Sequence, residues 1–400
     1  MNLNRPHIYK HPVSQNFASL TIWNVLLIGI PFLTIPYLIR VLGPERYGLI
    51  VFSQAFIQYF AFLLDYGFNY SSVREISIHR QDLTKTSLIF SSVIIIKLFF
   101  LLIAFFIVML ICFFFSRFHK DLLLYLATFA SLIGYALFPT FLFMGKERMK
   151  PILYLSIPSL VSTIFIFLFV KSSRDFMLVP LLNGLGSLIS AQLSLWFVRT
   201  KMHIQWITPT PKQLIVELKE GFLMFLSNIM AVGHANIRIF IVGILAGNLV
   251  TAYYVIGERL MSIMITFPLG LAVQAIYPRL CHVFLKDKDK IKILISRLQK
   301  ITNIAYFIIC IIAFIAAPMI TALMCGVSSS IATISFRLLI LSVILTAINA
   351  FYVQWLLAAG MIKTVAKIGI IAGFFGAVFV YPLTAIWSYK GAACSVMIIL

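Results

Sequence analysis

Ionisable side chains inside long apolar segments are the residues of this chain best suited to chemistry. A charge at the bilayer centre costs about 2.5 to 3.5 kcal/mol on insertion scales, so each needs a partner or a hydrated cavity. Six such residues are Asp65, Lys97, Arg238, Glu258, Arg259 and Arg337. Four are cations and two are carboxylates, and an apolar interior with surplus positive charge is suited to a phosphate or pyrophosphate group. A drug or metal-cation exporter is expected to show the opposite sign.

Lys97 is the strongest single candidate for a substrate contact. It lies about eleven residues into its apolar segment, near the bilayer middle and too deep for its amine to reach the surface easily. Asp65 is expected nearer the inner surface, so no carboxylate of the first half should match the depth of Lys97. We predict that Lys97 lines a hydrated cavity, with hydrogen bonds to hydroxyl or carbonyl groups as the alternative. Asp65 is either a structural cap or a site for coupling protons.

The second half carries the other candidates near one predicted turn. Arg238 and Glu258 lie on opposite sides of it, at depths of about 10 to 12 Å, and could form an ion pair. Arg259 points about 100° away from Glu258 around the helix and needs something else. The predicted substrate-binding set is Lys97, Arg238, Arg259, His234, Arg337 and Arg40. His234 shares a helix face with Arg238, whereas Arg337 and Arg40 lie near the outer edge, where they could reach the surface.

Apolar segments that hold these residues dominate the chain. Of its 400 residues 62% are hydrophobic and 11% charged, and the mean hydropathy is +1.03, which is typical of a polytopic helical membrane protein. The expected spans are 16–39, 47–68, 87–115, 122–144, 151–170, 176–198, 221–246, 251–278, 301–324, 332–360 and 366–388. A further apolar segment begins at Gly391 and stops at Leu400, too short to cross a bilayer. The sequence thus predicts about 12 transmembrane helices, the last incomplete and the chain cut short.

The positive charges mark topology. The formal net charge is +20, and most of the 32 Lys and Arg residues fall in segments that face the cytoplasm if the N-terminus does. A nucleic-acid partner is not expected, because such a protein gathers its cations on one soluble face. The five cysteines show neither a C-x-x-C pair nor a nearby His at ligand spacing, so neither a metal site nor a cofactor is predicted.

A polar stretch near the middle divides the chain. It contains Pro209, Thr210 and Pro211, where Thr can cap and Pro can open a short helix. We predict an N-terminal lobe at 1–198, a cytoplasmic linker at 199–220 and a C-terminal lobe at 221–400. A faint repeat relates Ile39–Gly43 to Ile244–Gly247 and favours two six-helix lobes with pseudo-two-fold symmetry.

Two inner loops, 69–86 and 279–300, are long enough for helices on the membrane surface. In 279–300 apolar residues alternate with many lysines, as in a helix on anionic headgroups, although plain topology-setting charge is an equally good explanation.

The N-terminal stretches Pro36–Gly48, Leu64–Asn69 and Val73–Ile76 resemble the opening of the polysaccharide flippases of the Wzx type. These belong to the multidrug, oligosaccharidyl-lipid and polysaccharide exporter superfamily. The resemblance is specific over about the first 85 residues and looser at Lys212–Gly221 and Gly247–Arg259.

The resemblance implies a two-lobe carrier of the bacterial inner membrane that works by alternating access. Its expected cargo is an undecaprenyl-pyrophosphate-linked repeat unit of O-antigen or lipopolysaccharide, held in a cationic cavity by Lys97, Arg238 and Arg259. A polysaccharide polymerase and a chain-length regulator are the implied protein partners, besides the lipid-linked oligosaccharide and the bilayer.

Other functions stay open at this point. A flippase for another lipid-linked glycan, such as a peptidoglycan precursor, fits equally well, whereas the charge balance disfavours a cation-coupled drug antiporter. A membrane enzyme such as a polysaccharide polymerase or ligase needs a substantial outer loop for its catalytic groups, and the outer loops expected here are short. We therefore expect a transporter and not an enzyme.

Overall fold

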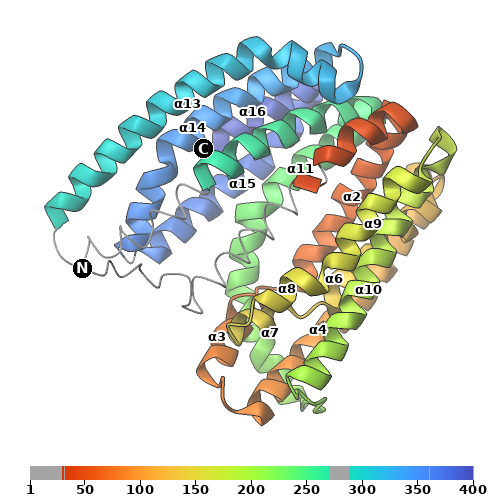
Figure 1. The fold of residues 1–400 in the computed structure, drawn as a ribbon, viewed down its shortest axis with the longest axis vertical. Helices are drawn as coiled ribbons and strands as arrows, with labels where there is room; N and C mark the ends of the chain where they lie inside the picture. The colour runs from red at the N-terminus through yellow and green to blue at the C-terminus, as the bar shows by residue number, and fades with distance from the viewer. Residues whose placement is uncertain (1–28, 31, 271–287, 360, 400) are drawn as a thin grey trace, which may run out of the picture. The chain divides into compact units, whose positions relative to one another are not determined.

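The protein consists of helices joined by short connections in the part of the chain that the structure describes (Figure 1). This structure is a computed structural model, and it describes residues 29–30, 32–270, 288–359 and 361–399. Nine helices of this part are long and apolar enough to cross a membrane. The predicted all-α polytopic fold is confirmed, but a count of about 12 spans is not. Much of the predicted first span, 16–39, lies outside the described residues, and the helix Phe32–Leu42 covers its end.

The chain divides into two compact units. The first unit centres on Phe56–Asn228, and the second combines Ile35–Ala55 with Ile229–Leu400. The helix α2 (Pro44–Asp65) therefore contributes residues to both. These units differ from the predicted lobes in two segments, because residues 35–55 belong to the second unit and residues 199–228 to the first. The symmetric pair of six-helix lobes stays a prediction.

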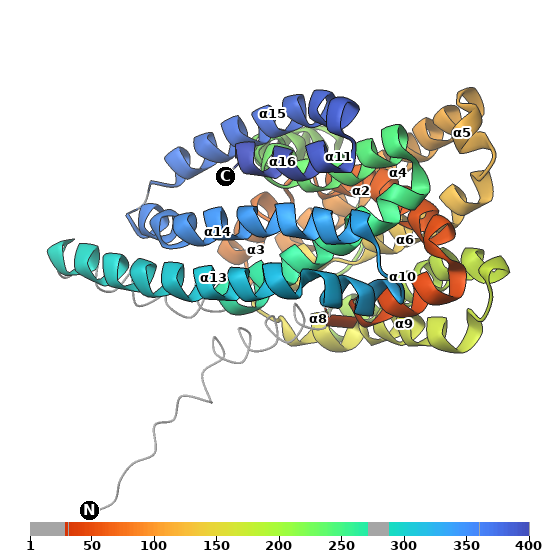
Figure 2. The same cartoon turned by 90° about the horizontal axis from the view of Figure 1, so that it is seen from above.

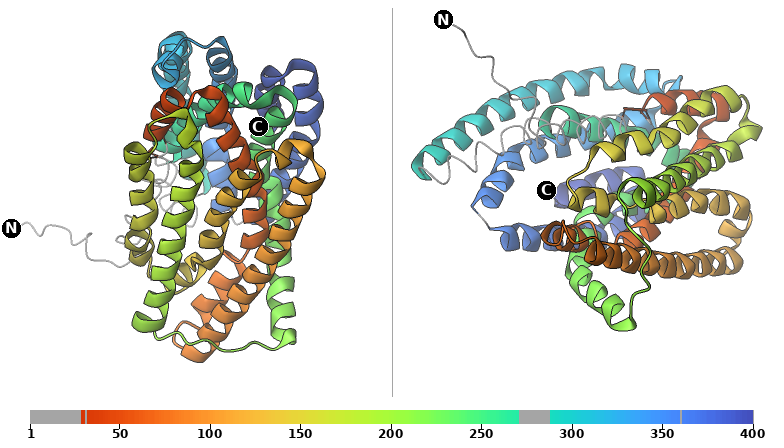
Figure 3. Two further views of the ribbon diagram at one scale, coloured as in Figure 1. Left: turned by 90° about the vertical axis from the view of Figure 1, so that its right-hand side faces the viewer. Right: turned by 60° about the horizontal axis from the view of Figure 1, so that its bottom comes forward.

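The first unit is built on α4, α6, α9 and α10. Its helices are α3 (Ser71–Ile78), α4 (Leu83–Phe114), α5 (Ser116–His119), α6 (Leu122–Leu137), α7 (Thr140–Gly145), α8 (Lys150–Leu155), α9 (Ile157–Phe169), the 3-10 helix η2 (Ser173–Met177) and α10 (Leu178–Lys201). The helix α10 packs along both α6 and α9, and α9 and α10 run side by side in the left view of Figure 3. The segment 69–86 contains the helix α3, which packs against α7 through the buried Ile76, and its position on the membrane surface stays a prediction.

Small residues let the helices of the first unit approach closely. A Cβ added at Gly134 of α6 would lie 2.5 Å from the main chain of Ser187 in α10. A Cβ at Gly186 of α10 would lie 2.1 Å from the hydroxyl of Ser162 in α9. Close packing of this kind replaces the hydrophobic effect as the main attraction between helices surrounded by lipid.

The second unit contains the long C-terminal helices. They are the part of α11 (Pro211–Met264) from Ile229 onward, the π-helical turn η3 (Ile265–Gly270), α13 (Lys288–Cys325), α14 (Ser330–Ala358), α15 (Ile362–Trp387) and α16 (Tyr389–Ile399). The helix α13 packs along α14, and α16 packs against α15 and α14 (Figure 2).

Gly247 interrupts α11 at the predicted turn between spans 221–246 and 251–278. Its φ of 84° and ψ of 175° are not helical, and the positive φ favours a residue without a Cβ. The main chain just after it lies against α2, since a Cβ at Gly48 would be 1.8 Å from the carbonyl oxygen of Asn248. The sequence therefore placed this boundary correctly.

Two predicted segments differ from the structure. Pro211 opens a helix as expected, with the main-chain N–H of Thr210 donating to Oε1 of Gln213 at 2.7 Å. That helix is not short, however, because nothing breaks the periodic apolar pattern before Gly247. Of the surface helix expected at 279–300, residues 279–287 lie outside the described part. The remainder is the beginning of α13, whose continuous helix runs on into a membrane span instead of ending at the surface.

Candidate functional site

Lys97 is buried among aromatic side chains in the first unit. It lies midway along α4 and is only 4% exposed. Its amine lies over two rings, 5.4 Å from the centroid of Phe141 and 5.7 Å from that of Tyr135. Ring faces carry partial negative charge, so they stabilise an ammonium group without neutralising it. The contacts that the described residues show for the amine of Lys97 are thus with ring faces and not with a carboxylate.

Asp65 interacts electrostatically with Lys97, although the described residues contain no ion pair between them within 4.0 Å. The expected difference in membrane depth between Asp65 and Lys97 stays a prediction. The side-chain amide of Asn69 donates a hydrogen bond to Oδ1 of Asp65. This contact closes the turn after α2, where Tyr66 and Gly67 both have positive φ. The local geometry supports the structural reading of Asp65 over the coupling-proton reading.

Arg238 and Glu258 form a buried ion pair in the second unit. The guanidinium of Arg238, which is 2% exposed, donates from Nε to Oε1 of Glu258 at 2.8 Å and from Nη2 to Oε2 at 3.4 Å. The hydroxyl of Tyr254 donates to the same Oε1 at 2.7 Å. The structure thus shows the pairing that the sequence allowed. In the described part of the chain, Nη1 of Arg238 has no hydrogen-bond partner.

Arg259 lies on another face of α11. It is exposed, whereas the adjacent Glu258 is buried, as expected for neighbours about 100° apart on a helix. Because Glu258 is held by Arg238, the charge of Arg259 is left for another group. The side chain of His234, the remaining candidate on this helix, lies outside the described residues.

Arg40 and Arg337 both hold carbonyl groups of α13. Arg40 donates from Nη2 to the carbonyl oxygen of Leu323 at 2.7 Å, in the last turn of the helix, where carbonyls lack partners within the helix. Arg337 donates from Nε to the carbonyl oxygen of Phe314 at 3.2 Å and stacks over its ring at 4.8 Å. These contacts give both residues a structural role, and their predicted contact with substrate stays a prediction.

Two further charged features were not among the predicted site residues. Glu217 is 8% exposed, and its carboxylate accepts a hydrogen bond from the hydroxyl of Ser72 at 3.3 Å. Burial raises its pKa to about 7. The second feature is a cationic pocket at one end of the first unit, which involves Lys146, Arg148 and Lys201. Their clustering depends on which loops meet in space, so a linear pattern of cations gives no signal for it.

A family model for polysaccharide biosynthesis proteins matches residues 13–284 of the chain, well over half of its length. The chain belongs to this family. Two similar family relatives are both named "Putative O-antigen transporter". The protein of Escherichia coli (strain K12) is 25% identical over 92% of this chain and 89% of its own. That of Shigella dysenteriae is 28% identical over 92% of each chain.

The family member also shares its fold with solved transporters. The lipid II flippase MurJ in an inward closed conformation has a TM-score of 0.73 at 14% identity, covering 95% of this chain and 84% of that one. An inward-facing multidrug resistance MATE family transporter of the MOP superfamily has a TM-score of 0.72 at 13% identity, covering 92% and 90%. The resemblance predicted from the N-terminal stretches is thus confirmed, and these relatives and neighbours are transporters, not enzymes.

Proposed function

We propose that this polysaccharide biosynthesis protein flips undecaprenyl-pyrophosphate-linked oligosaccharide repeat units across the bacterial inner membrane by alternating access. It would act in the assembly of O-antigen or another surface polysaccharide, together with a polymerase and a chain-length regulator. The family match over residues 13–284 carries the proposal. Support comes from the two relatives named as O-antigen transporters and from a fold shared with a lipid flippase.

Unneutralised positive charge supports a phosphate-bearing cargo. Lys97 in the first unit is buried under two aromatic rings, and Arg259 in the second unit lies beside a carboxylate that Arg238 already holds. A pyrophosphate group offers several acceptor oxygens to such cations. In this proposal Lys97 and Arg259 each contact the pyrophosphate during the cycle, and Arg238 shapes the helix that carries Arg259. The isoprenoid tail stays in the bilayer throughout.

The direction of transport follows from the proposed orientation. In this proposal the segments rich in Lys and Arg face the cytoplasm together with the N-terminus, an orientation that the positive-inside rule favours. The cargo is then collected on the cytoplasmic leaflet and released on the periplasmic one.

The test replaces Lys97→Gln and Arg259→Gln, separately and together, in a strain of the source bacterium that lacks its own copy of the gene. We expect lipid-linked repeat units to accumulate on the cytoplasmic leaflet and surface polysaccharide to fall about tenfold or more in the double variant, since each charged hydrogen bond contributes about 1.5 to 3 kcal/mol. Membrane levels of each variant are measured by immunoblot.

Arg337→Gln is the matched control, because it removes a cation of the same kind whose contacts are with Phe314. It should leave surface polysaccharide close to the wild-type level. Normal polysaccharide in the double variant would refute the assigned residues. If deletion of the gene left the lipid-linked repeat units normally distributed between the two leaflets and impaired another lipid-linked glycan instead, the proposed cargo would be refuted.

A further inference from the structure

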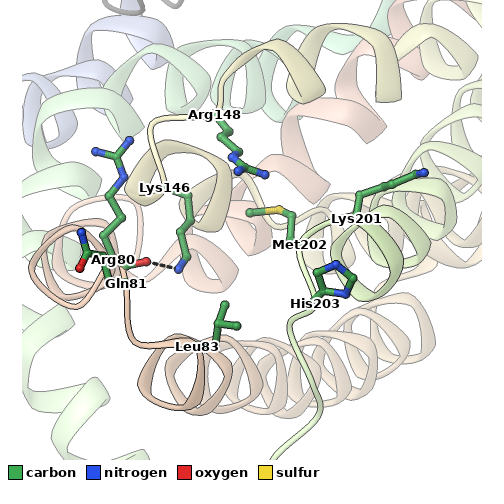
Figure 4. A pocket seen from close by; sticks show the side chains of 8 residues that line it. All are labelled: Arg80, Gln81, Leu83, Lys146, Arg148, Lys201, Met202 and His203. Carbon is green, nitrogen blue, oxygen red and sulfur yellow. Dashed lines mark hydrogen bonds between the residues drawn. The ribbon is translucent and has the colours of Figure 1, made fainter.

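A positively charged pocket lies at the end of the first unit where three connections meet (Figure 4). It has a volume of about 470 Å³. Its lining includes the cations Arg80, Lys146, Arg148 and Lys201 together with His203, and no carboxylate of the described residues lines it. Arg80 lies in the turn between α3 and α4, and Lys146 and Arg148 lie in the turn between α7 and α8. Lys201 is the last residue of α10, and His203 follows two residues later. We call this the cationic pocket.

The positive charges of the cationic pocket are only partly satisfied by the protein. Arg80 pairs with Glu147, with 2.8 Å between Nη1 and Oε2, and Lys146 donates a hydrogen bond to the main-chain oxygen of Arg80 (Figure 4). In the described part of the chain, neither Lys146 nor Arg148 nor Lys201 has an ion pair. Burial, and then Arg148 and Arg80, lower the pKa of Lys146. An anion placed among these cations would offset the cost of burying the Lys146 charge and would reduce the repulsion between the cations.

Asp82 is the carboxylate with an electrostatic effect on Lys146, but it is engaged elsewhere. It precedes the first residue of α4 and accepts a hydrogen bond from the main-chain N–H of Lys85 at 2.9 Å. That is the ordinary role of an aspartate at the start of a helix, where N–H groups lack partners within the helix. Asp82 therefore does not fill the cationic pocket.

An apolar groove adjoins the cationic pocket at His203, which lines both. The groove has a volume of about 750 Å³. Its walls are Phe90, Ile94 and Leu98 of α4, Leu195 and Val198 of α10, and Trp206. Arg199 stands beside it as a further cation. A cationic pocket that shares the lining residue His203 with an apolar groove matches a molecule with an anionic head and a hydrocarbon chain.

The segment between pocket and groove is fixed in place. Two main-chain N–H groups donate to serine hydroxyls of α4, Gln205 to Ser87 at 3.1 Å and Ile207 to Ser91 at 3.0 Å. Ser87 and Ser91 are one helical turn apart, so they present a matched pair of acceptors. His203 itself has a φ of 55°, a left-handed conformation that a non-glycine residue adopts at some cost. The chain therefore holds His203 at the junction in one conformation.

We propose that the cationic pocket and the apolar groove together bind a phosphate-bearing membrane lipid. Its phosphate lies among Lys146, Arg148 and Lys201, and its hydrocarbon chain lies between α4 and α10 past Trp206. Arginine and lysine are suited to phosphate oxygens, the former through its fork of N–H donors. The site is formed within the first unit, and it is independent of the cargo contacts proposed for Lys97 and Arg259. The occupant we assign is an anionic phospholipid, and the experiment distinguishes it from a polyprenyl pyrophosphate, which shares the required chemistry.

The test uses the full-length protein in detergent, with phosphatidylglycerol, phosphatidylcholine, undecaprenyl pyrophosphate and inorganic phosphate as probes. Binding is measured by native mass spectrometry and by quenching of tryptophan fluorescence with brominated chains. The binding variant is Arg148→Gln with Lys201→Gln. Its matched control is Lys120→Gln with Arg174→Gln, which removes two exposed cations from the opposite end of the same unit. Trp206→Phe identifies the part of the quenching that arises in the groove.

We expect phosphatidylglycerol to bind about tenfold or more weakly to the binding variant than to the wild type or the control. Brominated phosphatidylglycerol should quench the fluorescence more strongly than brominated phosphatidylcholine does. Trp206→Phe should remove most of this difference between the two lipids. Displacement of phosphatidylglycerol by undecaprenyl pyrophosphate at lower concentration would overturn the assignment to phospholipid, and failure of that displacement supports it. Competition by inorganic phosphate as strong as that of either lipid, or equal binding by the two double variants, would overturn the proposal. These measurements involve no transport, so they are separate from the test of the flippase function.

Discussion

The two units bury a cation in different ways. In the second unit, Arg238 is matched by Glu258, and Tyr254 completes the coordination of the carboxylate. In the first unit, the amine of Lys97 lies against two aromatic rings. Asp65 acts on it electrostatically, but the described residues contain no ion pair between the two side chains. One charge is neutralised inside the protein, while the other is tolerated. Buried cations of the same sign can thus serve different purposes, the first stability and the second, as we propose, recognition of cargo.

The largest effect is expected from Arg238→Met, which leaves Glu258 buried without its partner. Breaking a buried ion pair by removing one member typically costs about 3 to 5 kcal/mol. We expect a large loss of thermal stability in detergent, measured as the melting temperature by fluorescence-detected size exclusion.

The double variant Arg238→Met with Glu258→Gln is the control for this change. Removing both charges should recover much of the lost stability, because the cost arises from an unpaired charge and not from lost packing. A double variant as unstable as Arg238→Met alone would contradict this account.

Much of this contrast could be anticipated from the sequence, and the part that failed has a physical cause. Depth along a helix follows from residue counting, so the pairing of Arg238 with Glu258 and the break at Gly247 were accessible. Lateral position is not, because it depends on how helices pack. That is why neither the electrostatic influence of Asp65 on Lys97 nor the cationic pocket around Lys146 and Arg148 was predicted.

The second prediction concerns Glu217, a buried carboxylate that forms no ion pair in the described part of the chain. The pKa of Glu217 is raised from 4.5 to about 7, and burial is the main cause. The hydrogen bond from Ser72 lowers this pKa, and the nearby carboxylates Glu220 and Glu75 raise it. Folding therefore favours the protonated form. The contribution of Glu217 to stability is most favourable below pH 4.5 and becomes less favourable as the pH rises to about 7, because the unfolded chain releases the proton first.

Glu217→Gln should remove this dependence. At pH 8 the variant is expected to be more stable than the wild type by about 2 to 3 kcal/mol, and at pH 4.5 the two should be similar. Melting temperatures across this range measure the difference. Glu45→Gln, at an exposed position of α2 that does not act on Glu217, should follow the wild-type curve. Parallel curves for wild type and Glu217→Gln would show that Glu217 is not the group responsible.

A smaller effect is expected from Tyr254→Phe, which tests how much of the Arg238 site depends on its third member. The change removes the hydrogen bond of 2.7 Å to Glu258 but leaves the ion pair intact. A buried hydrogen bond to a charged group contributes about 1.5 to 3 kcal/mol, and the remaining guanidinium contacts should limit the loss to about 1.5 kcal/mol. A loss as large as that of Arg238→Met would mean that Tyr254, and not Arg238, stabilises the carboxylate.

The smallest change in stability is expected from Lys97→Met, the same kind of substitution as Arg238→Met. Methionine keeps a long flexible side chain against Tyr135 and Phe141, and the loss of the cation–ring contacts is offset by removing a buried charge. We expect the melting temperature to stay within a few degrees of wild type, as for a change below about 1 kcal/mol. Surface polysaccharide should nevertheless fall, because the cation available to the cargo is gone. A marked loss of stability would show that Lys97 is held in the fold by a partner of its own, and the contrast between the two units would then disappear.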